Sequence, residues 1–240
     1  MAVAYVKDTG IKTASSFATT TGSFATLPTV GNHVIVGSGL WTSGTLGIDA
    51  VTDNQSNSYA ENGDPGIGNG TATLYSCKVA TSSGTYTLTL DPTSASGNYA
   101  AWGAVEVSGL DATTHLDQTG EGTGTTTGDV LATASGANST ADGIAIAVAA
   151  QVASDTDINI SDTPPSGYTN IIFYENSSAI IGFSMVYKIY SASETSSAQF
   201  VHDNTSQEEW AGVIATYKMA AAGGTAVKDI IGSGIIPFAR

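Results

Sequence analysis

Short runs in which apolar residues dominate, or alternate with polar ones, recur along the chain between clusters of Gly, Asn, Asp, Ser and Pro. The alternation is clearest at Tyr86, Leu88 and Leu90, which point to one face while the intervening threonines point to the other. The runs with this character are residues 33–41, 48–52, 71–80, 85–90, 99–107, 143–151, 168–174, 180–190, 198–202 and 209–219. No convincing amphipathic helix separates them, so the pattern predicts an all-β fold built as an antiparallel sandwich.

One run stands out because it carries five large residues at a period of two. They are Ile181, Phe183, Met185, Tyr187 and Ile189. The opposite face carries glycine, serine and lysine. We therefore predict that this strand lies centrally in a sheet and that its odd-numbered face packs into the core.

The two ends of the chain differ from its middle. Residues 1–30 are rich in Thr, Ser and Ala and predict an extended N-terminal arm or one or two peripheral strands, whereas residues 31–219 form the predicted sandwich domain. Residues 220–240 begin with an Ala and Gly run and end in an apolar tail. We expect this tail to make an assembly contact through Ile230, Ile231, Ile235, Ile236 and Phe238.

Between the predicted strands, residues 111–128 are the longest low-complexity stretch. A stretch of this length inside a domain is expected to be a loop, serving either as a binding surface or as the crossover between two sheets.

The excess of acidic over basic residues excludes some classes of binding partner. Of 240 residues only 12% are charged, and 7 Lys and Arg stand against 21 Asp and Glu, giving a net charge of -14. Nucleic-acid binding and attachment to anionic membranes both need clustered basic residues, so we expect neither. Hydrophobic residues make up 41% of the chain, enough for a real core, and no apolar stretch is long enough to span a bilayer. The N-terminus also lacks the features of a signal peptide.

The only cysteine, Cys77, rules out an internal disulfide. It lies within an apolar run, so we expect it to be a small buried hydrophobic residue.

Residues that commonly carry catalysis are present but scattered. The histidines are His33, His115 and His202, and the acids associated with predicted strands are Glu106, Glu175, Glu208 and Glu209. A catalytic triad needs a nucleophile and a carboxylate to converge on a histidine, and a glycosidase needs two facing carboxylates. The sequence shows neither arrangement, so we expect no enzymatic activity and no cofactor.

Two acidic stretches have the oxygen-rich character of calcium loops. The first runs from Asp53 to Asn57 and is followed by Glu61 and Asp64; the second, weaker one contains Asp155 and Asp157. The first lacks the glycine and the final acid of an EF-hand. A turn stabilised by Asp and Asn side chains explains the same residues without a metal.

The three tryptophans leave two interpretations open. Trp41, Trp102 and Trp210 each lie in or at the end of an apolar run, which favours core packing. If two of them were exposed on one face, they would form a platform for stacking sugar rings.

Three stretches suggest a family: IDAVTDNQSNSY, AAWGAVEVSGLD and the segment that begins HLDQTGEG and ends ADGIAIAVAA. Across about residues 33–219, they resemble a β-sandwich module of tailed-bacteriophage virion proteins and some bacterial surface proteins. The module's turn motif is V-T-D-x-x-G-N-x-Y, and this chain has Ser56 where the module commonly has glycine. The resemblance implies a jelly-roll-like fold and a virion or surface setting, and it carries no catalytic residues.

The resulting expectation is a structural virion protein of a bacteriophage, most simply a capsid accessory or decoration protein. Its partners would be other virion proteins and further copies of itself, in a particle assembled in the host cytoplasm. The alternative is a carbohydrate- or receptor-binding module of a phage tail or fibre, with a host-surface glycan as ligand. Exposure of the tryptophans would favour the alternative. A third hypothesis, a glycosidase-like enzyme, requires two carboxylates facing each other across a cleft.

Overall fold

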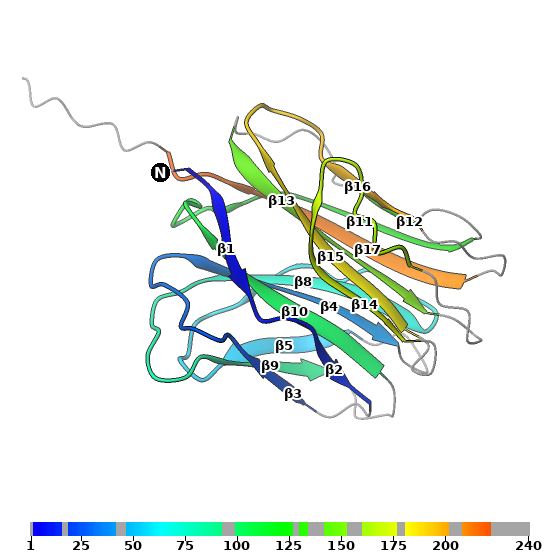
Figure 1. The fold of residues 1–240 in the computed structure, drawn as a ribbon, viewed down its shortest axis with the longest axis horizontal. Helices are drawn as coiled ribbons and strands as arrows, with labels where there is room; N and C mark the ends of the chain where they lie inside the picture. Colours follow the sequence, from blue (N-terminus) through cyan, green and yellow to red (C-terminus); the bar gives the residue numbers. More distant parts are fainter. Residues whose placement is uncertain are drawn as a thin grey trace, which may run out of the picture.

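The structure is a computed structural model that describes residues 2–15, 19–41, 47–92, 99–126, 130–133, 142–152, 160–176, 181–201 and 208–221. In these segments every regular element is a β-strand and every strand pair is antiparallel. Figure 1 shows four layers: two central sheets stacked face to face, each covered on its outer side by a smaller sheet. The predicted all-β antiparallel sandwich is confirmed.

The central sheets are built from separate halves of the chain. The first has the order β1 (Ala4–Asp8), β10 (Tyr99–Ser108), β4 (His33–Trp41), β8 (Gly70–Lys78) and β6 (Ala60–Gly63), with β2 (Lys12–Ala14) also paired to β10 and β7 (Gly66–Ile67) to β8. The second has the order β11 (Leu116–Thr126), β17 (Glu208–Lys218), β13 (Gly143–Val152), β15 (Ile181–Tyr190) and β14 (Thr169–Asn176). The connection from β10 to β11 carries the chain from one half to the other.

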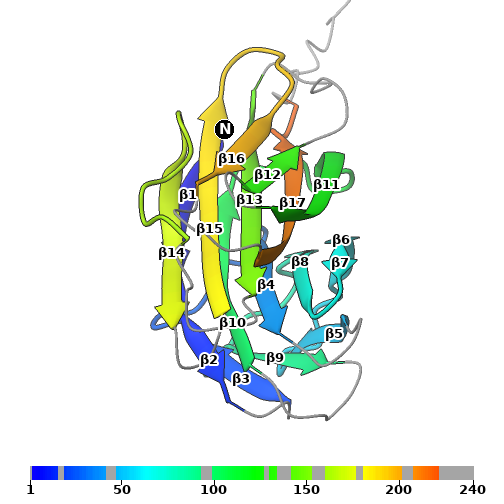
Figure 2. The ribbon, with the colours of Figure 1, turned by 90° about the vertical axis from the view of Figure 1, so that its right-hand side faces the viewer.

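Each outer sheet is made from the same half of the chain as the central sheet beneath it. The first outer sheet has the order β3 (Thr20–Ser23), β9 (Thr87–Pro92) and β5 (Ile48–Asp53), and the second pairs β12 (Val130–Thr133) with β16 (Ser197–Phe200). Figure 2 shows the stack from the side, with β3, β9 and β5 at the bottom and β12 and β16 at the top.

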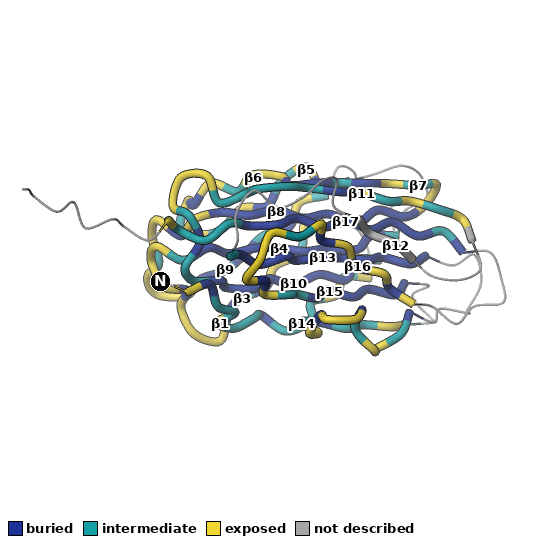
Figure 3. Tube along the Cα trace, turned by 90° about the horizontal axis from the view of Figure 1, so that it is seen from above, coloured by how far each residue is buried: buried dark blue, intermediate teal, exposed yellow. Residues whose placement is uncertain are grey.

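Three hydrophobic clusters fill the spaces between the four layers. Members include Ile35 and Phe183 between the central sheets, Val36 and Leu88 beneath the first outer sheet, and Ile214 and Phe200 beneath the second. Because both faces of the central strands are covered, all ten residues of β13 are buried. Figure 3 shows the same pattern, with buried residues along the central strands and exposed ones in the turns.

The prediction for the run from 181 to 189 is confirmed in part. Ile181, Phe183 and Met185 are fully buried against the first central sheet, as expected for an inward face. Ile189 is 48% exposed, so its predicted burial is wrong. The pairing of β14 with β15 stops at Tyr187, so Ile189 is paired with β13 on one side and lies beyond the end of β14 on the other.

The expected loop at residues 111–128 is wrong over most of its length. Residues 116–126 form β11, an edge strand that pairs with β17 from Leu116 to Thr126. Residues 111–115 do form the crossover between the two central sheets.

At the N-terminus, β1 and β2 pair with β10, and β3 pairs with β9, so these three segments add strands to two sheets of their own chain. The five residues expected to make the assembly contact, Ile230, Ile231, Ile235, Ile236 and Phe238, lie outside the described residues. The described segments contain no helix long and apolar enough to cross a membrane.

Candidate functional site

A small pocket, which we call the inter-sheet pocket, lies where the two central sheets meet at one end of the sandwich. Its volume is about 210 Å³. It is lined by Thr13, Ala14, Ser15, Tyr99, Ala100, Tyr174, Asn176 and Ile181. The first five come from β2, the residue after it and β10 of the first central sheet, and the last three from β14 and β15 of the second.

Aromatic side chains shape the wall of this pocket. Tyr99 and Tyr174 are half-buried, so part of each ring remains accessible. The ring of Tyr99 lies 6.0 Å from that of Trp41, because the two residues are register partners on β10 and β4. The Asn176 Nδ2 donates a hydrogen bond of 2.8 Å to the Tyr174 hydroxyl, since residues two apart on a strand share a face.

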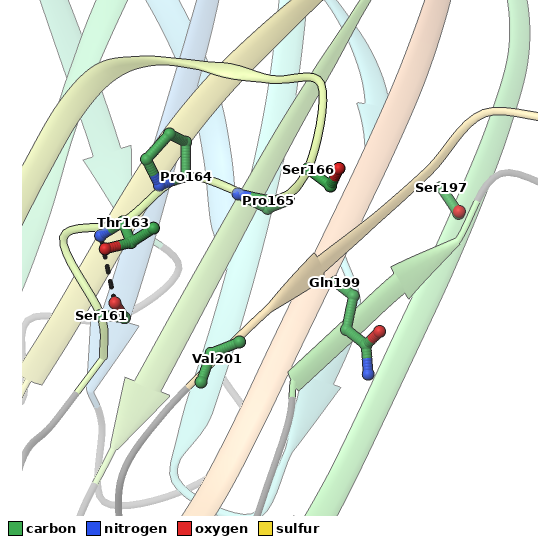
Figure 4. Close-up of a pocket in the computed structure, with 8 residues that line it drawn as sticks. All are labelled: Ser161, Thr163, Pro164, Pro165, Ser166, Ser197, Gln199 and Val201. Carbon is green, nitrogen blue, oxygen red and sulfur yellow. Dashed lines mark hydrogen bonds between the residues drawn. The ribbon is translucent and has the colours of Figure 1, made fainter.

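A larger groove lies on the other side of the second central sheet, between residues 161–166 and β16 (Figure 4). Its volume is about 500 Å³, and we call it the Pro164–Pro165 groove. It is lined by Ser161, Thr163, Pro164, Pro165, Ser166, Ser197, Gln199 and Val201. The Ser161 amide donates to the Val201 carbonyl at 2.8 Å and so ties the loop to the end of β16. These lining residues include no aromatic and no charged side chain.

Two of the three histidines meet at the other end of the central sheets; His202 lies outside the described residues. The rings of His33 and His115 lie 4.4 Å apart, and the His115 Nε2 is 2.9 Å from the Ser76 Oγ. His115 also stacks on Tyr217, whose hydroxyl donates to the Asn62 Oδ1 at 2.8 Å. The cluster therefore joins β4, β8 and β6 of one central sheet to β17 of the other.

The surroundings of these histidines favour the neutral rings. The pKa of His33 is lowered to about 4, first by burial and then by the nearby His115 and Lys78. Asp111 raises it by a smaller amount. Burial also lowers the pKa of His115, again opposed by Asp111. The serine of the Ser76–His115 pair is only 1% exposed, so its hydroxyl cannot reach a substrate. The pair acts as a packing and hydrogen-bonding contact between the sheets.

The candidate acids do not converge. Glu175 and Glu209 sit on β14 and β17, with β15 and β13 between these strands. Glu175 on β14 is in register with Gly182 on β15, which is in register with Gln151 on β13. Gln151 is in turn in register with Trp210 on β17, so the backbones of Glu175 and Trp210 lie three strand spacings, or about 14 Å, apart. Glu209 is next to Trp210 in β17 and therefore points to the opposite face of the sheet from Glu175, so the two carboxyl groups do not face each other as those of a glycosidase do.

The remaining candidate acids are buried or take part in hydrogen bonds and ion pairs within the fold. Glu106 lies in the other central sheet, where it accepts hydrogen bonds from the Thr29 amide and Asn32 and pairs with Lys7 at 3.0 Å. Glu208 is only 1% exposed, and the Glu209 Oε2 accepts a hydrogen bond from the Asn69 amide.

The first candidate calcium stretch forms a hydrogen-bonded turn. The Asp53 Oδ1 accepts the backbone amides of Gln55 and Asn57 at 2.9 and 3.0 Å, and its Oδ2 accepts the Asn57 side-chain amide and the Tyr59 hydroxyl. Burial opposes ionisation of Asp53, but these and neighbouring hydrogen bonds together lower its pKa. The arrangement supports the interpretation as an Asx-type turn. Within the described residues no three His, Cys, Asp or Glu side chains gather as metal ligands, and Asp155 and Asp157 lie outside them.

The tryptophans divide into two groups. Trp102 and Trp210 are buried in the hydrophobic clusters beneath the outer sheets, as core packing predicts. Trp41 is half-buried beside Tyr99 at the inter-sheet pocket, so the alternative of a platform made by two exposed tryptophans is wrong. The free thiol of Cys77 is buried, and that prediction is confirmed.

The inter-sheet pocket was not predicted from the sequence, although its two tyrosines lie at or near the ends of predicted strands. Comparison of the chain with protein-family models, with curated proteins and with solved structures finds no match.

Proposed function

We propose that this chain is a structural virion protein of a bacteriophage, most simply an accessory or decoration protein on the capsid surface. The observation that best supports this is the conformation of Ser56. Its φ of 63° is left-handed, and the phage module that the sequence resembles commonly has glycine at this place in the turn. A left-handed position favours glycine, so the backbone at Ser56 agrees with a motif that commonly has glycine at this place.

The four-layer architecture suits a structural role in which the protein acts through subunit contacts. Buried contacts between layers hold the body together, and the outer edges of β14 and β11 carry polar side chains that a neighbouring subunit can contact. The apolar tail with Ile230, Ile235 and Phe238 is proposed as the anchor to the shell or to another copy.

The test uses particles of a phage that encodes this chain. Gradient-purified particles are analysed by mass spectrometry and by immunogold labelling with an antibody against the purified chain. We expect many copies per particle on the head surface, and loss of incorporation when residues 224–240 are deleted while circular dichroism shows an intact sandwich. Recovery of the chain only outside particles would refute the proposal, and unchanged incorporation of the deletion variant would remove the tail from it.

The second candidate function is a carbohydrate- or receptor-binding module of a tail or fibre. The half-buried position of Trp41 beside Tyr99 favours it, because a partly accessible aromatic pair is a surface on which a sugar can stack. Binding of the purified chain to a glycan array, lost in Trp41→Ala, would support this function. An array without hits would argue against it.

A further inference from the structure

The inter-sheet pocket has the size of a site for one small ring. At about 210 Å³ it is smaller than the roughly 300–1,000 Å³ of pockets that hold drug-sized ligands. It is formed by both central sheets, since Tyr99 belongs to β10 and Tyr174 to β14. Strands of a packed sandwich supply these walls, so the site exists before a ligand arrives.

Its surfaces combine aromatic rings with hydrogen-bonding groups. Tyr99 and Tyr174 are each half-buried, and Trp41 extends the aromatic surface behind Tyr99. Aromatic faces of this kind pack against the C–H groups of a ligand ring. Around them, Thr13 and Ser15 bring hydroxyl groups and Asn176 brings an amide held against the Tyr174 hydroxyl.

The pocket is also neutral. All eight described lining residues are uncharged, and Glu175, between two of them in sequence, is exposed and points to the opposite face of β14 by strand alternation. The chain as a whole carries a net charge of -14 and would repel an anion. A phosphate or carboxylate ligand is therefore disfavoured, and a ligand with many hydroxyl groups and no charge fits the lining.

We propose that the inter-sheet pocket binds a single neutral pyranose ring, as the terminal residue of a glycan. This inference rests on the second proposed function and names its site, its ligand class and the residues that bind. The Pro164–Pro165 groove is larger, but its described lining has no aromatic face for a sugar ring. A substitution in this groove therefore serves as the control for binding at the inter-sheet pocket.

The experiment measures binding of glucose, galactose, mannose and N-acetylglucosamine to the full chain by saturation-transfer NMR, with affinities from titration. We expect at least one of the four to bind. Tyr174→Ala removes the ring and the partner of Asn176, and should weaken binding at least tenfold. Tyr174→Phe keeps the ring and should stay within about threefold, while Gln199→Ala in the groove should leave binding unchanged.

A second variant guards against a folding effect of Tyr174→Ala. Thr13 is exposed on β2, so Thr13→Trp adds a large ring at the mouth of the pocket without disturbing the core and should abolish binding. Thermal unfolding of each variant reports on folding. Failure of all four sugars to bind the wild-type chain overturns the inference, as does unchanged binding by both Tyr174→Ala and Thr13→Trp. Particle incorporation is measured separately, so the virion proposal stands or fails on its own result.

Discussion

Ser56 is the only residue other than glycine with a positive φ in the described part of the chain. A left-handed backbone costs an L-residue roughly 1 kcal/mol relative to glycine, which has no Cβ to clash. We therefore predict that Ser56→Gly raises the free energy of unfolding by about 0.5–1 kcal/mol, measured by urea denaturation.

The matched control is Ser58→Gly, two residues further along the same exposed turn but without a positive φ. There, glycine adds only flexibility to the unfolded chain, so stability should fall by about 0.5 kcal/mol. Equal effects of the two substitutions would contradict the conformational argument.

His33 gives the stability of the protein a dependence on pH. Its pKa is lowered from 6.5 in the unfolded chain to about 4 in the fold by burial and by the neighbouring His115 and Lys78. As pH falls below about 6.5, the unfolded state binds a proton before the folded state does, so stability is lost progressively towards pH 4. Between pH 7.5 and pH 5 the loss due to His33 is about 2 kcal/mol.

His33→Phe keeps a ring in the same place and removes the titration. Urea denaturation at the two pH values should show a drop smaller by about 2 kcal/mol in the variant than in the wild type. Because each protein is compared with itself at the two pH values, the change in packing caused by the substitution cancels. The lowered pKa of His115 leaves the variant with some loss of stability at low pH. The same drop in both proteins would exclude His33 as the cause.

At the scale of elements, a buried ion pair attaches the first strand to the sheet. Glu106 on β10 is fully buried and pairs with Lys7 on β1, and its other oxygen accepts from the Thr29 amide and the Asn32 side chain. Burial opposes ionisation, but the Thr29 amide, the Asn32 side chain and Lys7 together lower the pKa of Glu106. One carboxylate thus joins β1, β10 and the loop before β4.

Removing this carboxylate leaves two amide donors without their acceptor. It also removes the charge partner of Lys7, whose ammonium keeps its hydrogen bonds to the Thr26 hydroxyl and the Leu27 carbonyl. We predict that Glu106→Ala lowers the free energy of unfolding by about 3 kcal/mol and increases hydrogen exchange of the β1 amides. The control is Glu175→Ala, an exposed acid at the end of β14, where the change should stay within about 0.5 kcal/mol. A loss at Glu106 as small as that at Glu175 would show that the pair does not hold β1.

The strands themselves were largely predictable, and β11 shows where the prediction stops. Its sequence alternates Gly and Thr with few apolar residues, so the pattern favoured a loop. A Cβ at Gly124 would lie 2.7 Å from the ring of Trp210 on β17. Glycine here therefore accommodates a ring from a strand that lies far along the chain, which local alternation does not report.

At the scale of the whole molecule, the close approach of the central sheets depends on two glycines of β4. A Cβ at Gly39 would lie 2.8 Å from the Ala150 Cβ and 3.0 Å from the Phe183 ring, and one at Gly37 would lie 2.7 Å from the Val148 Cγ2. These distances are shorter than ordinary van der Waals contacts, so any side chain at these positions pushes the sheets apart.

We predict that Gly39→Ala lowers the free energy of unfolding by about 1–3 kcal/mol, the usual cost of overpacking a core. Phe183→Leu in the same background should recover part of this loss by making room, which a double-mutant cycle measures. Independent, additive effects of the two substitutions would contradict a direct contact between these positions.

The low charge of the chain follows from the four-layer stack. A two-layer sandwich leaves one face of every strand in water, and such faces normally carry charged residues. Here the central strands have no solvent face, and β13, with the sequence GIAIAVAAQV, is buried throughout. Small residues such as alanine on these strands let the layers pack closely on both sides.

Alternation and turn residues by themselves predicted most of the strands, the Asp53 turn and the burial of Cys77, because each of these leaves a pattern in residues close together in the sequence. The tertiary structure alone decided which strands became neighbours. It brought Thr13, Tyr99 and Tyr174 to one pocket, set His33 beside His115, and covered the outer faces of both central sheets. Strand order and layer stacking arise from packing between distant segments, and a period of two along one strand carries no information about its partner.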